Sequence, residues 1–140
     1  MKKLLLLPLL SLVLLSVCST ETKAQEKSAK DTLVVIWSSG DIQVAEKIVF
    51  MYVFNAKRAK WFDEVTFIVW GPSAKLLSET ESLQERVRSM MDAGIKVEAC
   101  IACARMYEVD DDLKKMGIDV KGMGVPLSNY LKKGYSVLTF

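Results

Sequence analysis

The 140-residue sequence contains no histidine. This absence excludes the Ser–His and Cys–His catalytic triads, because an imidazole is the base in both. Cysteine is also scarce: there are three, and Cys18 falls in an N-terminal leader. The other two, Cys100 and Cys103, stand in the stretch EACIACAR with C-x-x-C spacing. A zinc site needs four ligands, so this pair could bind zinc only at a site shared between subunits, and we predict no metal.

An excess of charge of one sign is lacking as well. The chain has 19 Lys and Arg against 17 Asp and Glu, a formal net charge of +2. That excess lies in the first 24 residues, and the rest of the chain has equal numbers of acidic and basic side chains. Proteins that bind nucleic acid usually carry a basic patch, and none is present here. The sequence therefore predicts no binding to nucleic acid and no electrostatic binding to an acidic membrane.

Residues 1–24 have the pattern of a secretory signal peptide. Lys2 and Lys3 precede the apolar run of residues 4–17, which is shorter than the roughly 20 residues of a membrane span. Small residues follow at the positions that a signal peptidase reads. We therefore predict cleavage after Ala24, and no membrane span.

An alternative leader ends at Cys18, as a lipid-modified cysteine. This is the weaker hypothesis, because the bulky Val17 precedes that cysteine in place of a small residue. With either leader the protein is predicted to be periplasmic or secreted. The remaining chain is predicted to comprise a flexible tether at residues 25–31 and a single domain at residues 32–140.

Five apolar segments predict strands, and the stretches between them predict helices. The first, residues 33–37, is apolar at every position, which is typical of a strand buried on both faces of a parallel sheet. The expected strands are residues 33–37, 64–70, 95–99, 119–123 and 136–140, and the expected helices are residues 43–56, 74–77, 82–93, 102–107, 110–116 and 126–133. This alternation predicts a three-layer α/β domain with a mostly parallel five-stranded sheet.

The helix expected at residues 43–56 is apolar nearly all round. Ala45 and Ile48 belong to one helical stripe, whereas Phe50 and Met51 fall on the other side. A helix on the outside of one small domain buries only one face. The second apolar face therefore predicts a subunit interface, and we expect a homo-oligomer.

Cys100 directly follows the strand expected at residues 95–99 and precedes a helix. Sites in parallel sheets lie at the carboxyl ends of strands, and a helix N-terminus favours a thiolate over a thiol. Arg105 adds positive charge, whereas Glu98 opposes it. Cys103 lies one helical turn further on, close enough to resolve a bond formed at Cys100. The pair can therefore exchange disulfides or carry sulfane sulfur as a persulfide.

The candidate pocket lies between the ends of the first and third strands. Its predicted substrate-binding residues are Ser38, Ser39, Gly40, Ile101, Ala102 and Arg105. Two simpler interpretations stay open: the cysteines as a structural disulfide or as buried hydrophobes, and residues 38–40 as a turn before the helix cap Asp41. Trp37 and Trp70 end strands and belong either to the rim of this pocket or to the core.

The segment KVEACIACAR, followed by LKKMGIDVKGMGVPLSNYLKKGYSVLTF, resembles the DsrE/DsrF-like family of small sulfur-relay proteins. The resemblance covers about residues 31–140, and its most specific points are the cysteine after the third strand, the G-I-x-V start of the fourth and the C-terminal G-x-x-V-L-T-F. It implies a flavodoxin-like fold of five parallel strands that assembles into dimers, trimers or hexamers. It also implies that Cys100 carries sulfur as a persulfide and that Cys103 matches a second cysteine of some members.

These observations lead to one principal hypothesis and one alternative. The principal hypothesis is an exported protein that handles sulfane sulfur through Cys100, as a persulfide carrier or by thiol redox chemistry, without a cofactor. Its partner is then a small molecule or protein that bears sulfane sulfur or a thiol. The alternative is a non-catalytic oligomeric binding or assembly module in which Cys100 and Cys103 form a structural disulfide.

Overall fold

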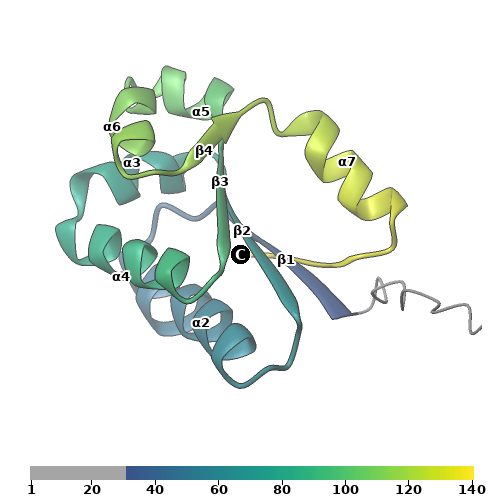
Figure 1. Ribbon diagram of the computed structural model, residues 1–140. Helices are drawn as coiled ribbons and strands as arrows, with labels where there is room; N and C mark the ends of the chain where they lie inside the picture. Colours follow the sequence, from purple (N-terminus) through teal and green to yellow (C-terminus); the bar gives the residue numbers. More distant parts are fainter. Residues whose placement is uncertain (1–30) are drawn as a thin grey trace, which may run out of the picture.

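Five parallel strands form one sheet in the order β4-β3-β2-β1-β5. The computed structural model describes residues 31–140, so the predicted signal peptide and nearly all of the predicted tether lie outside the described residues (Figure 1). The strands are β1 (Thr32–Trp37), β2 (Glu64–Val69), β3 (Lys96–Cys100), β4 (Asp119–Lys121) and β5 (Ser136–Thr139). The predicted α/β fold with a five-stranded parallel sheet is confirmed.

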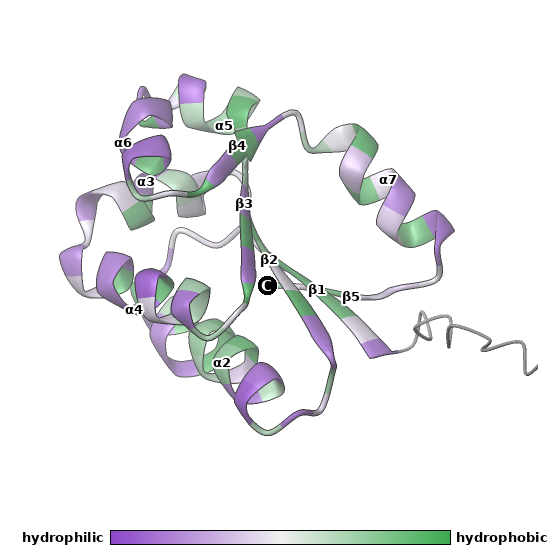
Figure 2. Cartoon of the chain, in the orientation of Figure 1, coloured by the Kyte–Doolittle hydropathy of each residue, from purple (hydrophilic) through white to green (hydrophobic). Residues whose placement is uncertain are grey.

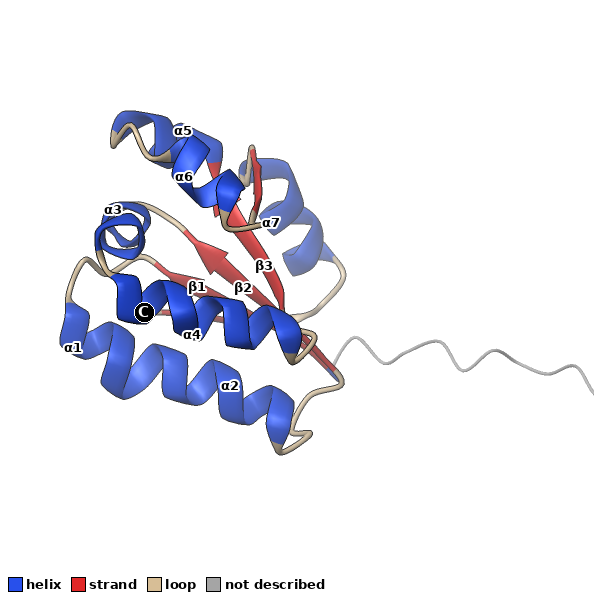
Figure 3. Ribbon diagram, turned by 60° about the vertical axis from the view of Figure 1, so that its left-hand side comes forward, coloured by secondary structure: helices blue, strands red, loops and turns tan. Residues whose placement is uncertain are grey.

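Helices cover both faces of the sheet and give three layers. They are α1 (Ile42–Val44), the π-helix η2 (Ala45–Val49), α2 (Phe50–Arg58), α3 (Pro72–Glu79), α4 (Glu81–Asp92), α5 (Ile101–Met106), α6 (Asp110–Lys115) and α7 (Gly124–Lys132). Of these described helices, α7 lies on one side of the sheet and the rest lie on the other (Figures 1 and 3).

Alternate strand residues divide the interior into two cores, because successive side chains of a strand point to opposite faces. Val35 and Phe67 belong to the larger core, under α2, α3 and α4. Val34 and Ile68 belong to the smaller core, under α7, together with Cys100. Every residue of β1 is buried, as its continuous apolar run predicts, and Figure 2 shows the apolar strands at the centre with polar residues on the outer helices. Cys100 therefore lies in the smaller core, between the sheet and α7.

A π turn interrupts the helix expected at residues 43–56. The Phe50 N–H donates to the Ala45 carbonyl five residues back, whereas an α-helix bonds four residues back. At this turn Phe50 is fully buried and Ile48 is 48% exposed. Ile48 and Phe50 lie on different sides of the helix, as the periodicity predicts, and Phe50 is the one that faces the core. Ile48 and Met51 instead form the exposed apolar face.

The ends of β4, α3 and α4 lie close to the expected residues. β4 ends at Lys121 and not at residue 123, since Met123 turns into the smaller core and is 1% exposed. α3 begins at Pro72, earlier than expected, because proline is well suited to the first turn of a helix. Gly94 follows the last turn of α4 with a φ of 81°, as predicted for a helix C-cap.

Candidate functional site

Cys100 is the last residue of β3 and also the residue at which α5 begins. Its extended backbone (φ −75°, ψ 112°) is followed at once by helical Ile101, so no loop separates strand and helix. Both Cys100 and Cys103 are free thiols. Cys100 is 6% exposed, and Cys103 is only partly buried. The two predicted catalytic residues therefore lie together at the carboxyl end of β3, with Cys103 nearer to solvent.

The two thiols interact directly. A hydrogen bond joins the side chains of Cys103 and Cys100, and Cys103 also contacts the backbone of Gly71 at the end of β2. Burial raises the pKa of the Cys103 thiol, the Gly71 backbone partly offsets this, and the neighbouring Cys100 raises it further. Because its pKa is raised, Cys103 keeps its proton at neutral pH and presents an S–H group beside Cys100.

Apolar and aromatic side chains surround Cys100 on the α7 side. Met123 shares its buried cluster, and Trp70 packs against that cluster from the end of β2. Trp37 is fully buried in the other core, stacked on Phe67 with ring centroids 6.0 Å apart. Of the two tryptophans that end strands, Trp70 therefore lies with the cysteines and Trp37 is a core residue.

The turn at residues 38–40 is held by local hydrogen bonds. The Ser38 hydroxyl donates to the Phe140 carbonyl (2.8 Å), and the Ser39 hydroxyl accepts from the Asp41 N–H (3.0 Å). The Asp41 carboxylate accepts from two backbone N–H groups of α1, at 2.7 and 3.3 Å. The interpretation of this segment as a capping turn is confirmed, and both serine hydroxyls are engaged in it.

Gly71 lies between the cysteines and the turn at residues 38–40: its backbone contacts Cys103, and a Cβ at its position would lie 3.9 Å from the Ser38 carbonyl oxygen. β2 separates β1 from β3 in the sheet, so that turn lies two strands from Cys100, about 10 Å away. Gly71 has a φ of 74°, which favours glycine. Gly40 lines a different hollow, of about 290 Å³, with Pro72 and Tyr107. The sequence signal for Gly71 was the Gly-Pro pair at the end of a strand.

The remaining predicted binding residues lie on α5. Ile101 is partly buried, whereas Ala102 and Arg105 are exposed. A hydrogen bond from Lys114 lowers the pKa of Asp110, and the charge of Arg105 lowers it further. Arg105 therefore acts on the start of α6.

A buried carboxylate lies next to the cysteines on the same face of the sheet. Glu98 is fully buried. Its carboxylate accepts hydrogen bonds from three side chains: Lys96 (2.5 Å), Lys121 (2.8 Å) and Tyr130 (3.0 Å). Burial by itself raises the pKa of Glu98, but these three donors outweigh burial and the net shift is downward. Glu98 is therefore ionised at neutral pH and its charge is balanced by the lysines.

Sequence reasoning missed this cluster, although one signal of it was present. Lys96, Glu98 and Cys100 alternate along β3, which puts their side chains on one face of the sheet. Lys121 and Tyr130 come from β4 and α7, so their approach depends on the tertiary structure. From the sequence alone, Glu98 is visible only as a charge that opposes thiolate formation.

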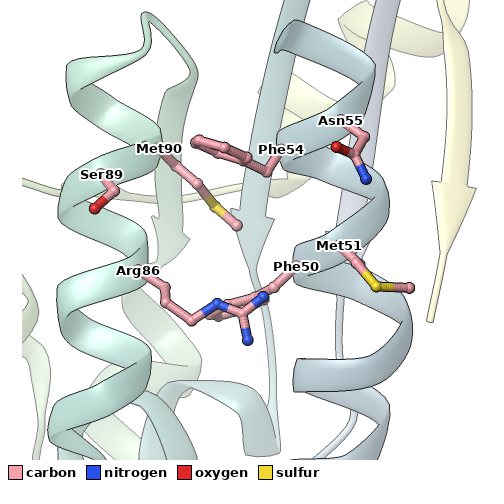
Figure 4. A pocket seen from close by; sticks show the side chains of 7 residues that line it. All are labelled: Phe50, Met51, Phe54, Asn55, Arg86, Ser89 and Met90. Carbon is pink, nitrogen blue, oxygen red and sulfur yellow. The ribbon is translucent and has the colours of Figure 1, made fainter. Parts of the chain in front are cut away.

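A second candidate site is a hollow of about 200 Å³ between α2 and α4, in the layer opposite α7. Its lining residues are Phe50, Met51, Phe54, Asn55, Arg86, Ser89 and Met90. Figure 4 shows Arg86 and Met90 reaching from α4 towards Phe50 and Phe54 on α2. The Arg86 guanidinium lies 5.2 Å from the centre of the Phe50 ring, a cation–π contact. With no thiol or carboxylate in its lining, this hollow suits an apolar side chain better than a reaction.

Two kinds of feature are absent from residues 31–140. No group of three or more Cys, Asp or Glu side chains in this part of the chain is arranged to hold a metal ion. No helix within it is both long and apolar enough to cross a membrane.

The model of the DsrE/DsrF-like family matches residues 31–140. The structure of BT1422 from Bacteroides thetaiotaomicron, a conserved protein of unknown function, is 33% identical over 81% of this chain and 97% of that one, with a TM-score of 0.77. The ychN protein from E. coli has the same fold at 12% identity, with a TM-score of 0.57 over 79% of this chain and 99% of that one. No curated protein matches.

Proposed function

The chain belongs to the DsrE/DsrF-like family, and from this premise we propose that it is an exported protein that captures sulfane sulfur on Cys100. Membership of the family supports a sulfur-relay type of role in general. The observation that carries the more specific proposal is the pair of free, mutually hydrogen-bonded thiols at the end of β3. The leader at residues 1–24 is the basis for proposing export.

Capture is a thiol exchange. The Cys100 thiolate attacks the sulfane sulfur of a polysulfide, persulfide or thiosulfonate donor, and a new S–S bond forms as the old one breaks. The leaving thiolate or sulfinate departs with the electron pair, and the thiol proton passes to solvent. Because only 6% of Cys100 is exposed, we expect small linear donors to react faster than bulky ones.

Release uses the second thiol. Cys103, once deprotonated, attacks either the outer sulfur, which moves to Cys103, or the Cys100 sulfur, which forms a disulfide and expels hydrosulfide. The disulfide product needs an external dithiol reductant before the next cycle. The pKa of Cys103 is raised by burial and by its neighbour, so release is slow at neutral pH and the sulfur is retained until an acceptor arrives.

A second candidate function is that of an assembly module. Three large apolar side chains are exposed: Ile48 (48%), Met51 (55%) and Trp61 (57%). Met51 lines both the hollow between α2 and α4 and a second hollow that Trp61 also lines. A projecting side chain beside two hollows suits packing against a second copy, so we propose a homo-oligomer. In this alternative the cysteines form a structural disulfide and no sulfur is carried.

Intact-mass measurement after brief treatment with polysulfide tests the capture of sulfur, with Cys18→Ser present in every chain so that Cys100 and Cys103 are the only thiols. The wild-type chain is expected to gain steps of about 32 Da, one sulfur atom each, and Cys100→Ser is expected to gain none. Cys103→Ser is the matched control, and it should keep the added sulfur for longer because it cannot release it. If wild type and Cys100→Ser gain sulfur equally, the carrier role is wrong. If thiols can be titrated only after reduction, the structural disulfide is correct.

A further inference from the structure

Lys121 on β4 is the direct neighbour of Cys100 across the sheet. The register of the two strands pairs Cys100 with Lys121 and Glu98 with Asp119. Paired residues of parallel strands point to the same face and lie about 4.8 Å apart. The four-carbon stem of a lysine spans that separation, so the Lys121 ammonium can reach a group attached to the Cys100 sulfur.

The present partners of Lys121 leave it able to move. Its ammonium bonds to Glu98 at 2.8 Å and to Asp119, and its side chain is 33% exposed. If Lys121 leaves, the buried Glu98 carboxylate still accepts from Lys96 at 2.5 Å and from Tyr130 at 3.0 Å. Glu98 is therefore never left without a donor when Lys121 turns towards Cys100.

Among residues 31–140, the buried cluster that contains Cys100 holds no cation that could replace Lys121. The side chains of its cluster are apolar or aromatic, among them Trp70, Met123 and Tyr130. Arg105 acts on Asp110 at the start of α6. Lys121 is therefore the cation that can contact an anion bound at Cys100.

We propose that Lys121 makes Cys100 selective for anionic sulfur donors and holds the negatively charged outer sulfur of the persulfide. This inference rests on the proposed function and specifies the substrate class of the same site. In the resting protein Lys121 is bound by Glu98 and Asp119. When the donor arrives, Lys121 exchanges one carboxylate contact for the incoming charge, which favours the anion over a neutral donor of similar size.

Two donors of different charge test this selectivity on the full chain carrying Cys18→Ser and Cys103→Ser, so that Cys100 is the one remaining thiol. The anionic donor is polysulfide, and the neutral donor is methyl methanethiosulfonate. With the neutral donor, Cys100 gains a methylthio group and methanesulfinate leaves with the electron pair of the broken bond. The ratio of the two rate constants, measured by intact mass, is expected to fall about fivefold or more in Lys121→Met, since one unit of charge at contact distance is removed.

Lys115→Met is the matched control, because Lys115 is an exposed lysine of α6 that bonds to Asp112 and not to Glu98. Its ratio should stay at the wild-type value, and Lys121→Arg should restore most of the selectivity.

A ratio that is unchanged in Lys121→Met overturns the inference and leaves the proposed function intact. If Cys100 takes up neither donor in any variant, both are overturned. Should Lys121→Met not fold, the ratio in the folded chain carrying Cys18→Ser and Cys103→Ser must still fall as salt is added, and a ratio independent of salt contradicts the inference.

Discussion

Glu98 lies two residues before Cys100 and is the only acidic residue among the buried side chains of residues 31–140. Removing an ionised carboxylate from water costs several kcal/mol unless partners compensate for the lost hydration. Here two ammonium groups and one hydroxyl do so, and they connect β3 to β4 and to α7. The cluster therefore ties β3 to β4 and α7 beside the buried core that contains Cys100.

Replacing Glu98 by glutamine tests this role and has a definite pH dependence. At pH 7 we expect Glu98→Gln to lose about 2–4 kcal/mol of unfolding free energy, since two lysines keep their charge without the carboxylate. The pKa of Glu98 is lowered in the folded state, so its contribution is full above its unfolded pKa of about 4.3 and is lost as the pH falls through the folded pKa. The gap between wild type and variant should therefore shrink below about pH 4.

Urea denaturation at a series of pH values measures this gap. Asp119→Asn is the matched control, because Asp119 also contacts Lys121 but its side chain is 51% exposed; it should cost less than about 1 kcal/mol at any pH. A gap between wild type and Glu98→Gln that is constant from pH 7 to pH 3 would contradict the account of the cluster.

At the scale of the element, some features of the stretch from α1 to α2 can be predicted from the sequence and others cannot. Apolar periodicity predicts a helix here and an excess of apolar surface, and both are present. It cannot predict the π turn of η2, because an i→i+5 bond is favoured by packing against the sheet and not by local propensity. Phe50 lies in the core while Ile48 and Met51 are exposed, and the periodicity alone does not decide which apolar side faces the core.

Met51→Lys tests whether this exposed face joins copies of the chain. A charge at the centre of an apolar contact is costly to bury, so the variant is expected to sediment as a monomer where the wild type sediments as an oligomer. Met106→Lys is the control, because Met106 is 77% exposed and lies on α5, away from α2. Wild-type protein that is monomeric at micromolar concentration, or an oligomer that persists in Met51→Lys, argues against an interface at α2.

The strands and the cysteine pair could be predicted because their signals are local. A continuous apolar run indicates a doubly buried strand, and a C-x-x-C after such a strand lies at the edge where parallel sheets hold their sites. The partners of that pair could not be predicted in the same way. Gly71, Lys121 and Tyr130 approach from other elements, and only the strand order and register bring them near Cys100 or Glu98.

At the scale of the whole molecule, the order β4-β3-β2-β1-β5 decides which strand ends are direct neighbours of Cys100. The sequence suggests that the ends of the first and third strands share a site, but β2 lies between them. The rim beside Cys100 is therefore built from the ends of β2 and β4, while residues 38–40 cap the first helix. The fold class can be predicted from the alternation of strands and helices along the sequence. Predicting which residues surround Cys100 also requires the order of the strands in the sheet.

The proposed export concerns the whole chain and has its own test. Protein recovered from the cell envelope is expected to begin at Gln25, and its intact mass shows this directly. Ala24→Arg places a large charged residue at the cleavage position and should leave the leader attached. Cys18→Ser should be processed normally. A mature chain that begins at Cys18 and carries lipid would contradict the predicted cleavage site.

The central claim is that Cys100, and not Cys103, receives the sulfur. Trypsin cleavage after Lys96 and Arg105 releases one peptide that contains both cysteines, and fragmentation of that peptide assigns added mass to either residue. After brief exposure of the folded chain to polysulfide and alkylation of the remaining thiols, the extra sulfur is predicted on Cys100. A peptide with no extra sulfur, or with all of it on Cys103, would contradict the account.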